Sequence, residues 1–290
     1  MEKAGKRRIK LLFKCFSWSI IISGSVLLLW GAVIEPNLLF VRRCEVILSD
    51  LPLEFHNARA VVIADTHFGN SFADRLRRDR IVRYFKREQP ELCLLLGDYA
   101  AVGALPHYGT LSAEELTEFF SKLKAPWGTY AVLGNHELWY GRSRMTAILE
   151  RAGVRMLENK LVKVKGVDLA GMPDSTVFPF DSKGFKKLID GRGTLLLLSH
   201  KGGMLRYADT SREVFMLAAD THGGQIRLPG AGSLKEVLYR KQELPPGLSE
   251  WWGKKLFITV GAGGHRLKFR LFCPPEIAVV TFKAKGKKAV

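Results

Sequence analysis

The chain contains five short, continuous runs of apolar residues, at 60–64, 92–96, 130–133, 195–198 and 215–218. Runs of this length without a polar interruption are typical of strands that are buried on both faces. Amphipathic segments lie between them at 73–87 and 143–152, and Ser112 is placed to cap a further helix. This alternation predicts an α/β fold in which helices cover a sheet.

The rest of the pattern predicts further strands at 41–48, 256–260, 267–273 and 276–282. Residues 172–193 and 229–253 follow neither a helical nor a strand period, and we expect loops there. No internal repeat is visible. We therefore expect a single catalytic domain over 37–290, preceded by a basic N-terminus and membrane anchor over 1–36.

The anchor is predicted from residues 15–34, which contain no charged side chain. About 20 apolar residues are enough to span a bilayer, and Trp18 and Trp30 lie toward the two ends, where interfacial aromatic residues are found. A cleaved signal peptide also has a basic start and an apolar middle, but this stretch is longer and no clear cleavage site follows it. We favour an uncleaved transmembrane or interfacial helix.

Positive charge is concentrated at both ends of the chain. The net charge is +17, and the first fourteen residues hold six Lys or Arg side chains against Glu2 alone. Such flanks either keep the termini solvated or attract anionic lipids, at about 1 kcal/mol per basic residue. We do not expect a nucleic-acid partner, because no stacking-aromatic motif or zinc finger accompanies the charge. The basic N-terminus favours a catalytic domain outside the cytoplasm, but Arg42 and Arg43 follow the anchor closely, so the side of the membrane stays open.

Polar residues that can bind metal follow each of the five apolar runs. They are Asp65-Thr66-His67, Gly97-Asp98, Gly134-Asn135-His136-Glu137, Ser199-His200 and Asp220-Thr221-His222-Gly223-Gly224-Gln225. Residues two apart at a strand end project to the same side, so Asp65 and His67 can hold one cation together. The four cysteines form no C-x-x-C pair and are read as packing residues, not as a disulfide framework or zinc site.

The number of candidate ligands points to two ions. Three aspartates, one asparagine and three histidines exceed what one tetrahedral site needs. A mixed oxygen and nitrogen set without thiolate suits manganese, iron or zinc. Two ions about 3.5–4 Å apart can clamp both the attacking and the leaving oxygen at phosphorus, and they lower the pKa of a bound water to about 7.

In this order, the motifs D-x-H, G-D, G-N-H-E, a later His and T-H-G-G-Q resemble those of the calcineurin-like metallophosphoesterases. The resemblance covers residues 40–282 and is closer to the bacterial membrane-anchored branch of that family. It implies a four-layer α/β/β/α sandwich. That branch includes phosphodiesterases and a lipid A pathway pyrophosphatase that acts on UDP-2,3-diacylglucosamine.

The resemblance also implies a role for each candidate residue. Asp65, His67 and His222 would hold the first metal, and Asp98 would bridge to the second. The second would be completed by Asn135, His200 and Asp220, whereas His136 would face the substrate phosphate and Glu137 would orient His136. The departure is Asp220, because the family has histidine there; aspartate favours a harder ion such as manganese, or leaves the second site weakened or empty.

These expectations combine into one functional hypothesis. The protein is expected to be a metal-dependent hydrolase of phosphodiester or pyrophosphate bonds, with two divalent ions, manganese first and iron or zinc as alternatives. The expected partners are the bilayer and a phosphate-containing, lipid-linked substrate, with UDP-2,3-diacylglucosamine the best guess, at the bacterial inner (cytoplasmic) membrane. The alternatives are a general phosphodiesterase or nuclease, or a catalytically weakened metal-binding membrane protein.

Overall fold

The computed structural model describes residues 2–102, 109, 111–175, 178–240, 243–264 and 268–286. Two six-stranded sheets face each other, and helices cover their outer faces. The four-layer α/β/β/α sandwich is therefore confirmed.

The first sheet holds the strands that begin and end the domain. Its order is β1 (Phe40–Leu48), β14 (Glu276–Ala284), β2 (Arg59–Ile63), β3 (Leu92–Leu95), β4 (Thr129–Ala131) and β5 (Arg155–Met156). Neighbouring strands are parallel except for β14 and β2, which are antiparallel. This arrangement brings the ends of β2, β3 and β4 to one edge.

The second sheet has antiparallel strands at both margins. Its order is β12 (Gly247–Trp251), β13 (Lys254–Ile258), β9 (Glu213–Ala219), β8 (Thr194–Lys201), β7 (Val167–Met172) and β6 (Lys160–Val164). The outer pairs β12–β13 and β6–β7 are antiparallel, and the central strands are parallel. A separate short hairpin joins β10 (Arg227–Leu228) to β11 (Gly232–Ser233).

Alternating side chains of the central strands build three apolar layers. On the first sheet, Val62 and Leu94 point into the layer between the sheets, whereas Val61 and Cys93 point outward. The outer layer packs under α2 (Phe72–Glu88), α3 (Ala113–Ser121) and α5 (Arg142–Arg151). On the second sheet, the outer layer packs under α6 (Ser182–Ile189). Burial on both faces explains why these strands read as continuous apolar runs.

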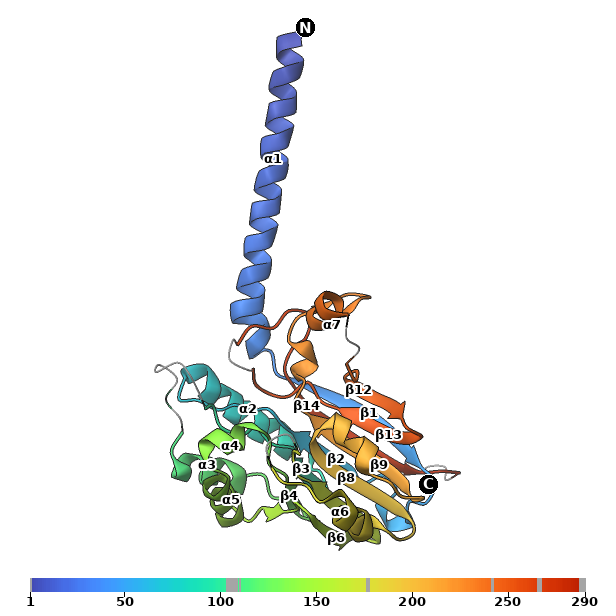
Figure 1. Ribbon diagram of the computed structural model, residues 1–290. Coiled ribbons are helices and arrows are strands. Elements are labelled where there is room, and N and C mark those ends of the chain that lie inside the picture. The colour runs from blue at the N-terminus through green and yellow to red at the C-terminus, as the bar shows by residue number, and fades with distance from the viewer. Residues whose placement is uncertain are drawn as a thin grey trace.

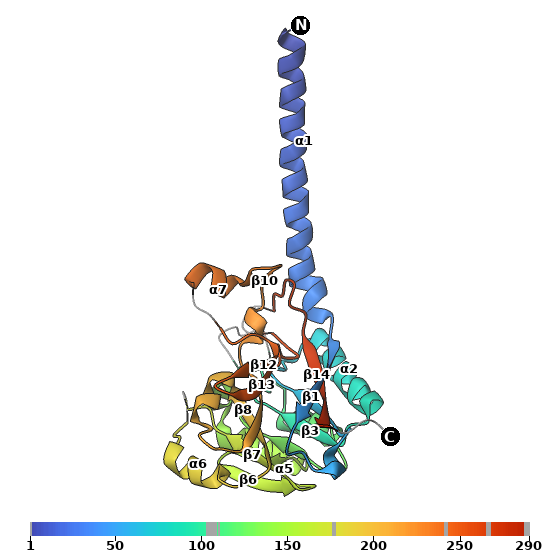
Figure 2. The same cartoon turned by 90° about the vertical axis from the view of Figure 1, so that its right-hand side faces the viewer.

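The N-terminal helix projects from the body (Figures 1 and 2). Helix α1 (Glu2–Leu29) continues through a π-helical turn (Trp30–Ile34) into a 3-10 turn (Glu35–Asn37). Among the described residues, the stretch Lys10–Asn37 is the one long and apolar enough to cross a membrane. Nothing in the structure divides residues 1–36 from 37–290 as domains, so that boundary stays a prediction.

Three sequence expectations about the second half were wrong. Residues 268–273 form no strand; the buried Arg270 instead donates to backbone carbonyls on both sides of it and holds the segment in an irregular shape. The expected loop at 172–193 contains α6, and the expected loop at 229–253 contains β11, α7 (Leu234–Tyr239) and β12. These elements have between two and eight residues, too few for a period to be recognised. All four cysteines are free, in agreement with the reading from the sequence.

Candidate metal centre

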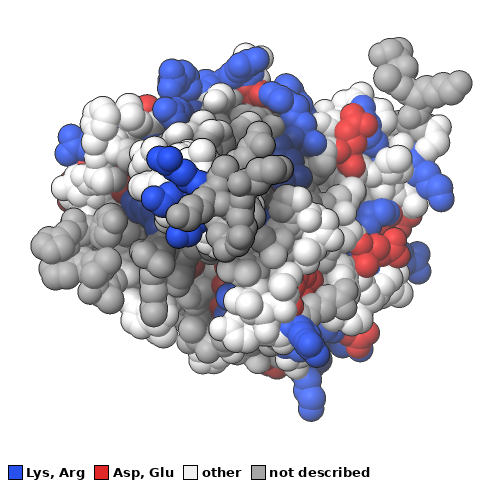
Figure 3. Space-filling model, turned by 90° about the horizontal axis from the view of Figure 1, so that it is seen from above, with Lys and Arg blue, Asp and Glu red and all other residues white. Residues whose placement is uncertain are grey.

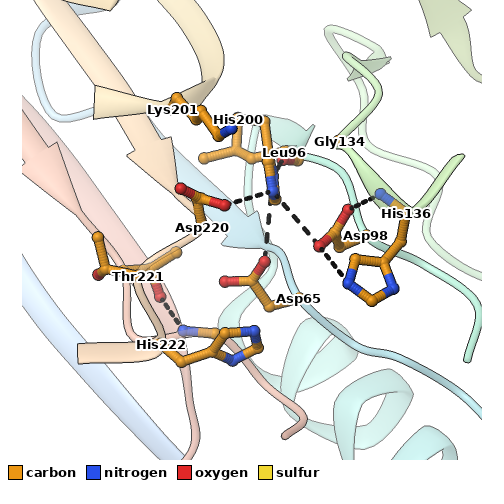
Figure 4. A network of polar contacts seen from close by, with 12 residues as sticks. Asp65, Leu96, Asp98, Gly134, His136, His200, Lys201, Asp220, Thr221 and His222 are labelled. Atoms are coloured by element: carbon orange, nitrogen blue, oxygen red, sulfur yellow. Dashed lines mark hydrogen bonds and ion pairs between the residues drawn. The ribbon is translucent and has the colours of Figure 1, made fainter. Parts of the chain in front are cut away.

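The loops that follow four central strands meet at one edge of the sandwich (Figure 4). Asp65 and His67 follow β2, Asp98 follows β3, and Asp220 and His222 follow β9. His200 lies near the end of β8, while Asn135 and His136 begin α4 (His136–Tyr140) after β4. Because parallel strands end at the same edge, segments far apart in sequence deliver their side chains to one place.

The side chains of six of these residues converge on Asp98 or on its neighbours. Asp98 Oδ2 lies 3.5 Å from His67 Nε2 and 3.4 Å from His200 Nε2. The Nε2 atoms of His67 and His222 are 3.2 Å apart, and His200 Nε2 is 3.5 Å from Asp220 Oδ1. Three groups have one ligand atom per residue, all within 4.8 Å of one another: Asp65, His67 and His222; His67, Asp98 and His136; and Asp65, Asp98 and His200. Asp98 lies between the groups, as a bridging carboxylate must.

Several buried polar atoms here have no hydrogen-bond partner among the described residues. They are both carboxylate oxygens of Asp65, Oδ1 of Asn135 and Nε2 of His200. Leaving such an atom unsatisfied costs about 1–3 kcal/mol, so native proteins rarely do so without a reason. All of these atoms are oxygen or nitrogen donors of the kind that divalent cations take. The residues present therefore fit a metal centre.

The orientation of His200 fixes which of its nitrogens faces the site. Its Nδ1 lies 2.7 Å from the carbonyl oxygen of Leu96 and must donate to it, because a carbonyl only accepts. Nε2 points toward Asp98 and Asp220, and it is the nitrogen that is left without a proton whenever the ring is neutral. A second hydrogen bond of this kind is what orients a metal-binding imidazole.

The charges of the site are strongly interdependent. Burial, reinforced by the negative charges of Asp98 and Asp220, raises the pKa of Asp65 to about 8 despite His200 nearby. Burial alone would also raise the pKa of Asp98, but His200, His67 and His136 outweigh it and hold that pKa below its ordinary value. One carboxylate is thus held ionised by histidines while its neighbour resists ionisation, a conflict that a bound cation would relieve.

The candidate ligands sit on strained backbone. Five of them have left-handed φ angles: Asp65, His67, Asp98, Asp220 and His222. Each such conformation is costly for a residue with a side chain, and it persists only where the surroundings enforce it. Here the enforcing contacts include Asp65 N donating to Gly97 O and His67 N donating to Asp98 O, both at 3.0 Å.

Glu137 lies beneath these loops and has a role that the sequence did not suggest. Its side chain is fully buried and accepts hydrogen bonds from the backbone N–H groups of Asp98, Tyr99 and Gly134, at 2.9, 2.9 and 2.7 Å. Burial and the charge of Asp98 together raise its pKa to about 7. This carboxylate thereby positions the two loops that carry Asp98 and Asn135. Its expected effect on the orientation of His136 stays a prediction.

Sequence reasoning also missed Lys201, which follows His200 directly. Its Nζ lies 3.2 Å from a carboxylate oxygen of the fully buried Asp174, and its side chain stands beside Asp220 in Figure 4. A cation at this position suits an anionic substrate. Its place next to His200 in the motif was the only available signal.

A sandwich of this kind, with carboxylate, imidazole and amide donors collected at its strand ends, defines a metal-dependent phosphoesterase. The family model for calcineurin-like phosphoesterases matches residues 58–268, and the chain belongs to that family. It is thus a hydrolase of a family that uses divalent metal ions, and the structure gathers candidate ligands for them.

Three curated relatives span most of the chain. An uncharacterized metallophosphoesterase of Aquifex aeolicus is 29% identical over 232 residues, covering 77% of this chain and 84% of the relative. An uncharacterized metallophosphoesterase of Campylobacter jejuni is 24% identical, with 98% and 74% covered. The UDP-2,3-diacylglucosamine pyrophosphatase LpxG of Chlamydia muridarum is 25% identical over 323 residues, with 91% and 95% covered.

Proposed function

We propose that the protein hydrolyses a phosphodiester or pyrophosphate bond in a lipid-linked substrate at a membrane surface. The specific substrate proposed is UDP-2,3-diacylglucosamine, cleaved to the lipid monophosphate and UMP. The likeness to LpxG across nearly the full length of both chains supports this choice. The observation that carries the lipid-linked class is the short chain of contacts that joins the base of the N-terminal helix to the loop of His222.

That contact runs through the segment around Cys273. The buried Glu35, at the base of the helix, accepts hydrogen bonds from Trp30 Nε1 and from the backbone N–H of Phe272 and Cys273. The Sγ of Cys273 in turn lies 3.4 Å from the carbonyl oxygen of His222. A few residues therefore join the end of an apolar helix to a candidate metal ligand, so a substrate anchored in the bilayer lies within reach.

The same helix end makes a second contact with this segment. The carbonyl oxygen of Gly31 accepts a hydrogen bond from Arg270 N at 2.9 Å. A side chain at Gly31 would meet the ring of Phe269 at 2.4 Å, so only glycine allows this approach. The helix base is thus fixed on the body, and the distance from bilayer to site does not depend on a flexible linker.

Two sets of ligands are assigned in the proposed site. Asp65, His67 and His222 would hold one ion together with Asp98, and Asn135, His200 and Asp220 would hold the other together with the same aspartate. When bound, the ions would polarise the phosphoryl oxygens and activate water. The extra oxygen ligand at Asp220 favours manganese over iron or zinc.

His136 is proposed to act on the leaving group. Its backbone N–H donates to Asp98 Oδ1 at 2.8 Å, and its ring packs edge-on against the rings of His67 and Trp139. These contacts hold the imidazole beside the ligands, with Nε2 3.9 Å from Asp98 Oδ2. From there it can stabilise charge on the phosphoryl group and give a proton to the leaving oxygen.

The proposed location is the bacterial inner membrane, with 1–36 as the anchor and 37–290 as the catalytic domain. Basic residues before the apolar segment favour a domain outside the cytoplasm, whereas a nucleotide-linked lipid precursor is a cytoplasmic substrate. Tags placed at each terminus and probed with a membrane-impermeant reagent decide between the two sides.

The test uses the full chain in lipid nanodiscs with added manganese. UDP-2,3-diacylglucosamine and a water-soluble aryl phosphodiester are supplied separately, and the Asp98→Asn variant is the control. Release of UMP by the wild type alone supports the proposal. Hydrolysis of only the aryl phosphodiester would favour the general phosphodiesterase, and no turnover with about one bound metal per chain would favour the weakened second site at Asp220.

A further inference from the structure

Helix α7 exposes its apolar side chains instead of burying them. Val237, Leu238 and Tyr239 are 43%, 64% and 75% exposed, and no residue of the helix is buried. The helix is nevertheless well formed at its start, where Ser233 and Glu236 make reciprocal capping hydrogen bonds. An amphipathic helix normally packs its apolar side on the core, so α7 is built for a contact outside the domain.

Helix α7 lies beside the end of α1 that meets the body, in both views (Figures 1 and 2). Other exposed apolar side chains lie in the same part of the molecule. Trp30 and Val33 of the helix end are 39% and 53% exposed, and Phe272, on the segment that contacts Glu35, is 52% exposed. A bilayer that surrounds α1 would therefore meet α7 as well.

The position of α7 is fixed by short contacts with the loop that follows β9 and carries His222. The backbone N–H of Leu234 donates to Ile226 O at 2.8 Å, and Arg227 donates to the carbonyl oxygen of Gly223 at 3.2 Å. A Cβ at Gly224 would lie 2.4 Å from that of Ser233, so the two segments are in close contact. The helix is thus held by the residues that follow His222, and its position is coupled to that of the site.

The charge on this side of the molecule suits anionic lipid headgroups. Lys235 of α7 is exposed, as is Arg240, which follows the last residue of the helix. A groove beside the helix base, between β1 and α2, is lined by Leu38 and Phe40, by Arg80 and Arg87, and by Arg43, which pairs with Glu88. Viewed along α1, Lys and Arg side chains gather at the edges of this face (Figure 3). Basic residues near an anionic membrane surface are attracted to it.

We propose that α7 inserts its apolar side chains into the bilayer that holds α1, as a second membrane contact of the catalytic domain. One helix alone would let the body rotate and tilt at the surface. Two membrane contacts, one at α1 and one at α7, fix the orientation of the catalytic domain. They keep the loop that carries Asp220 and His222, and that leads into the β10–β11 hairpin, against the headgroups. The partner is the lipid surface itself, and the inference does not depend on which phosphoester is cleaved.

The test measures lipid exposure by spin labelling of the full chain in vesicles of phosphatidylcholine and phosphatidylglycerol. Cys15 and Cys44 are first replaced by serine, since Cys93 and Cys273 are buried. Labels are then attached at Leu238→Cys and, in a second protein, at Tyr239→Cys. Val26→Cys, within α1, is the lipid-exposed reference, and Leu53→Cys, 65% exposed in the turn after β1, is the aqueous reference.

We expect the ratio of oxygen to nickel-chelate accessibility at positions 238 and 239 to be several-fold higher than at 53 and to approach that at 26. Aqueous values at 238 and 239 with a lipid value at 26 would overturn the proposal and leave the anchor intact. An aqueous value at 26 would overturn the anchor and the proposal together. Neither outcome depends on hydrolysis, so failure here is separable from failure of the proposed activity.

Discussion

Replacement of Glu137 by glutamine tests whether a buried carboxylate positions the metal loops. The carboxylate lies in the interior, with one oxygen accepting from Asp98 N and Gly134 N and the other from Tyr99 N. Glutamine has nearly the same shape but only one acceptor oxygen. If that oxygen keeps the hydrogen bonds from Asp98 N and Gly134 N, the amide NH₂ faces the N–H of Tyr99, and two donors then oppose each other.

The expected cost follows from these three hydrogen bonds. Hydrogen bonds to a charged group are worth about 1.5–3 kcal/mol each, and neutral ones about 1 kcal/mol. One bond lost and two weakened amount to about 2–4 kcal/mol of unfolding free energy. For a domain of this size, that is a fall in melting temperature of about 5–15 °C. Since the same bonds set the position of Asp98, manganese affinity should fall about 10- to 100-fold.

The assay compares wild type, Glu137→Gln and the matched control Glu118→Gln, whose side chain is 69% exposed on α3. Melting temperature, manganese binding by calorimetry and aryl phosphodiester hydrolysis are measured at pH 8, above the raised pKa of Glu137, so that the wild-type carboxylate is ionised. The control should match the wild type. An unchanged melting temperature in Glu137→Gln would refute the hydrogen-bond argument, and a lower one with unchanged metal affinity would refute the positioning role.

Three further predictions concern packing, pH and metal. In Gly134→Ala, the new Cβ would lie 2.2 Å from Asp98 Oδ1, so hydrolysis should fall at least about 10-fold, whereas Gly203→Ala, with no atom within 4 Å, should keep wild-type activity in the same assay. Burial by itself would raise the pKa of Asp74, but Lys268, Ser71 and Arg77 together outweigh burial and lower that pKa. The stabilisation by the ionised Asp74 is therefore fully present above the pKa of the unfolded state and is lost as the pH falls through the pKa of the folded state. Asp74→Asn should therefore cost about 3 kcal/mol at pH 7, and the difference from wild type in denaturant titrations should shrink below about pH 4; a constant difference would contradict this. Manganese at 100 times its dissociation constant should raise the unfolding free energy of the wild type by about 2.7 kcal/mol in the same titrations. An equal gain in Asp98→Asn would contradict the assignment of Asp98 as a metal ligand.

The parts of this molecule that were predictable from sequence are those fixed by neighbouring residues. The runs before Asp65 and Asp98 are buried on both faces, so their apolar pattern is local and shows the strands directly. The candidate ligands stand at the ends of those runs, and the spacing of Asp65 and His67 belongs to one loop. Within each sheet, their convergence follows from the rule that parallel strands end at a common edge. The meeting of the two edges depends on how the two sheets pack against each other.

The features that sequence did not predict depend on partners distant in the chain. Arg270 looked like part of a strand because its alternation with apolar neighbours is local, whereas its carbonyl acceptors at Val260 and Gly263 come from another segment. The pairing of Lys201 with Asp174 is of the same kind. Helix α7 was missed for a different reason, since it has only six residues and none of them is buried, so no side chain marks a period against the core.

The strain in the ligand loops bears on how folding and metal binding are related. Left-handed φ angles at several non-glycine ligands cost of order 1–3 kcal/mol each. The hydrogen bonds between the Asp65 and Asp98 loops, and those accepted by Glu137, offset that cost. The ligands are therefore positioned by the fold, and what remains for the metal to correct is electrostatic: the unsatisfied oxygens of Asp65 and its raised pKa. It follows that removal of metal should lower stability and abolish hydrolysis while leaving the sandwich folded, because the bonds that shape the loops belong to the protein alone.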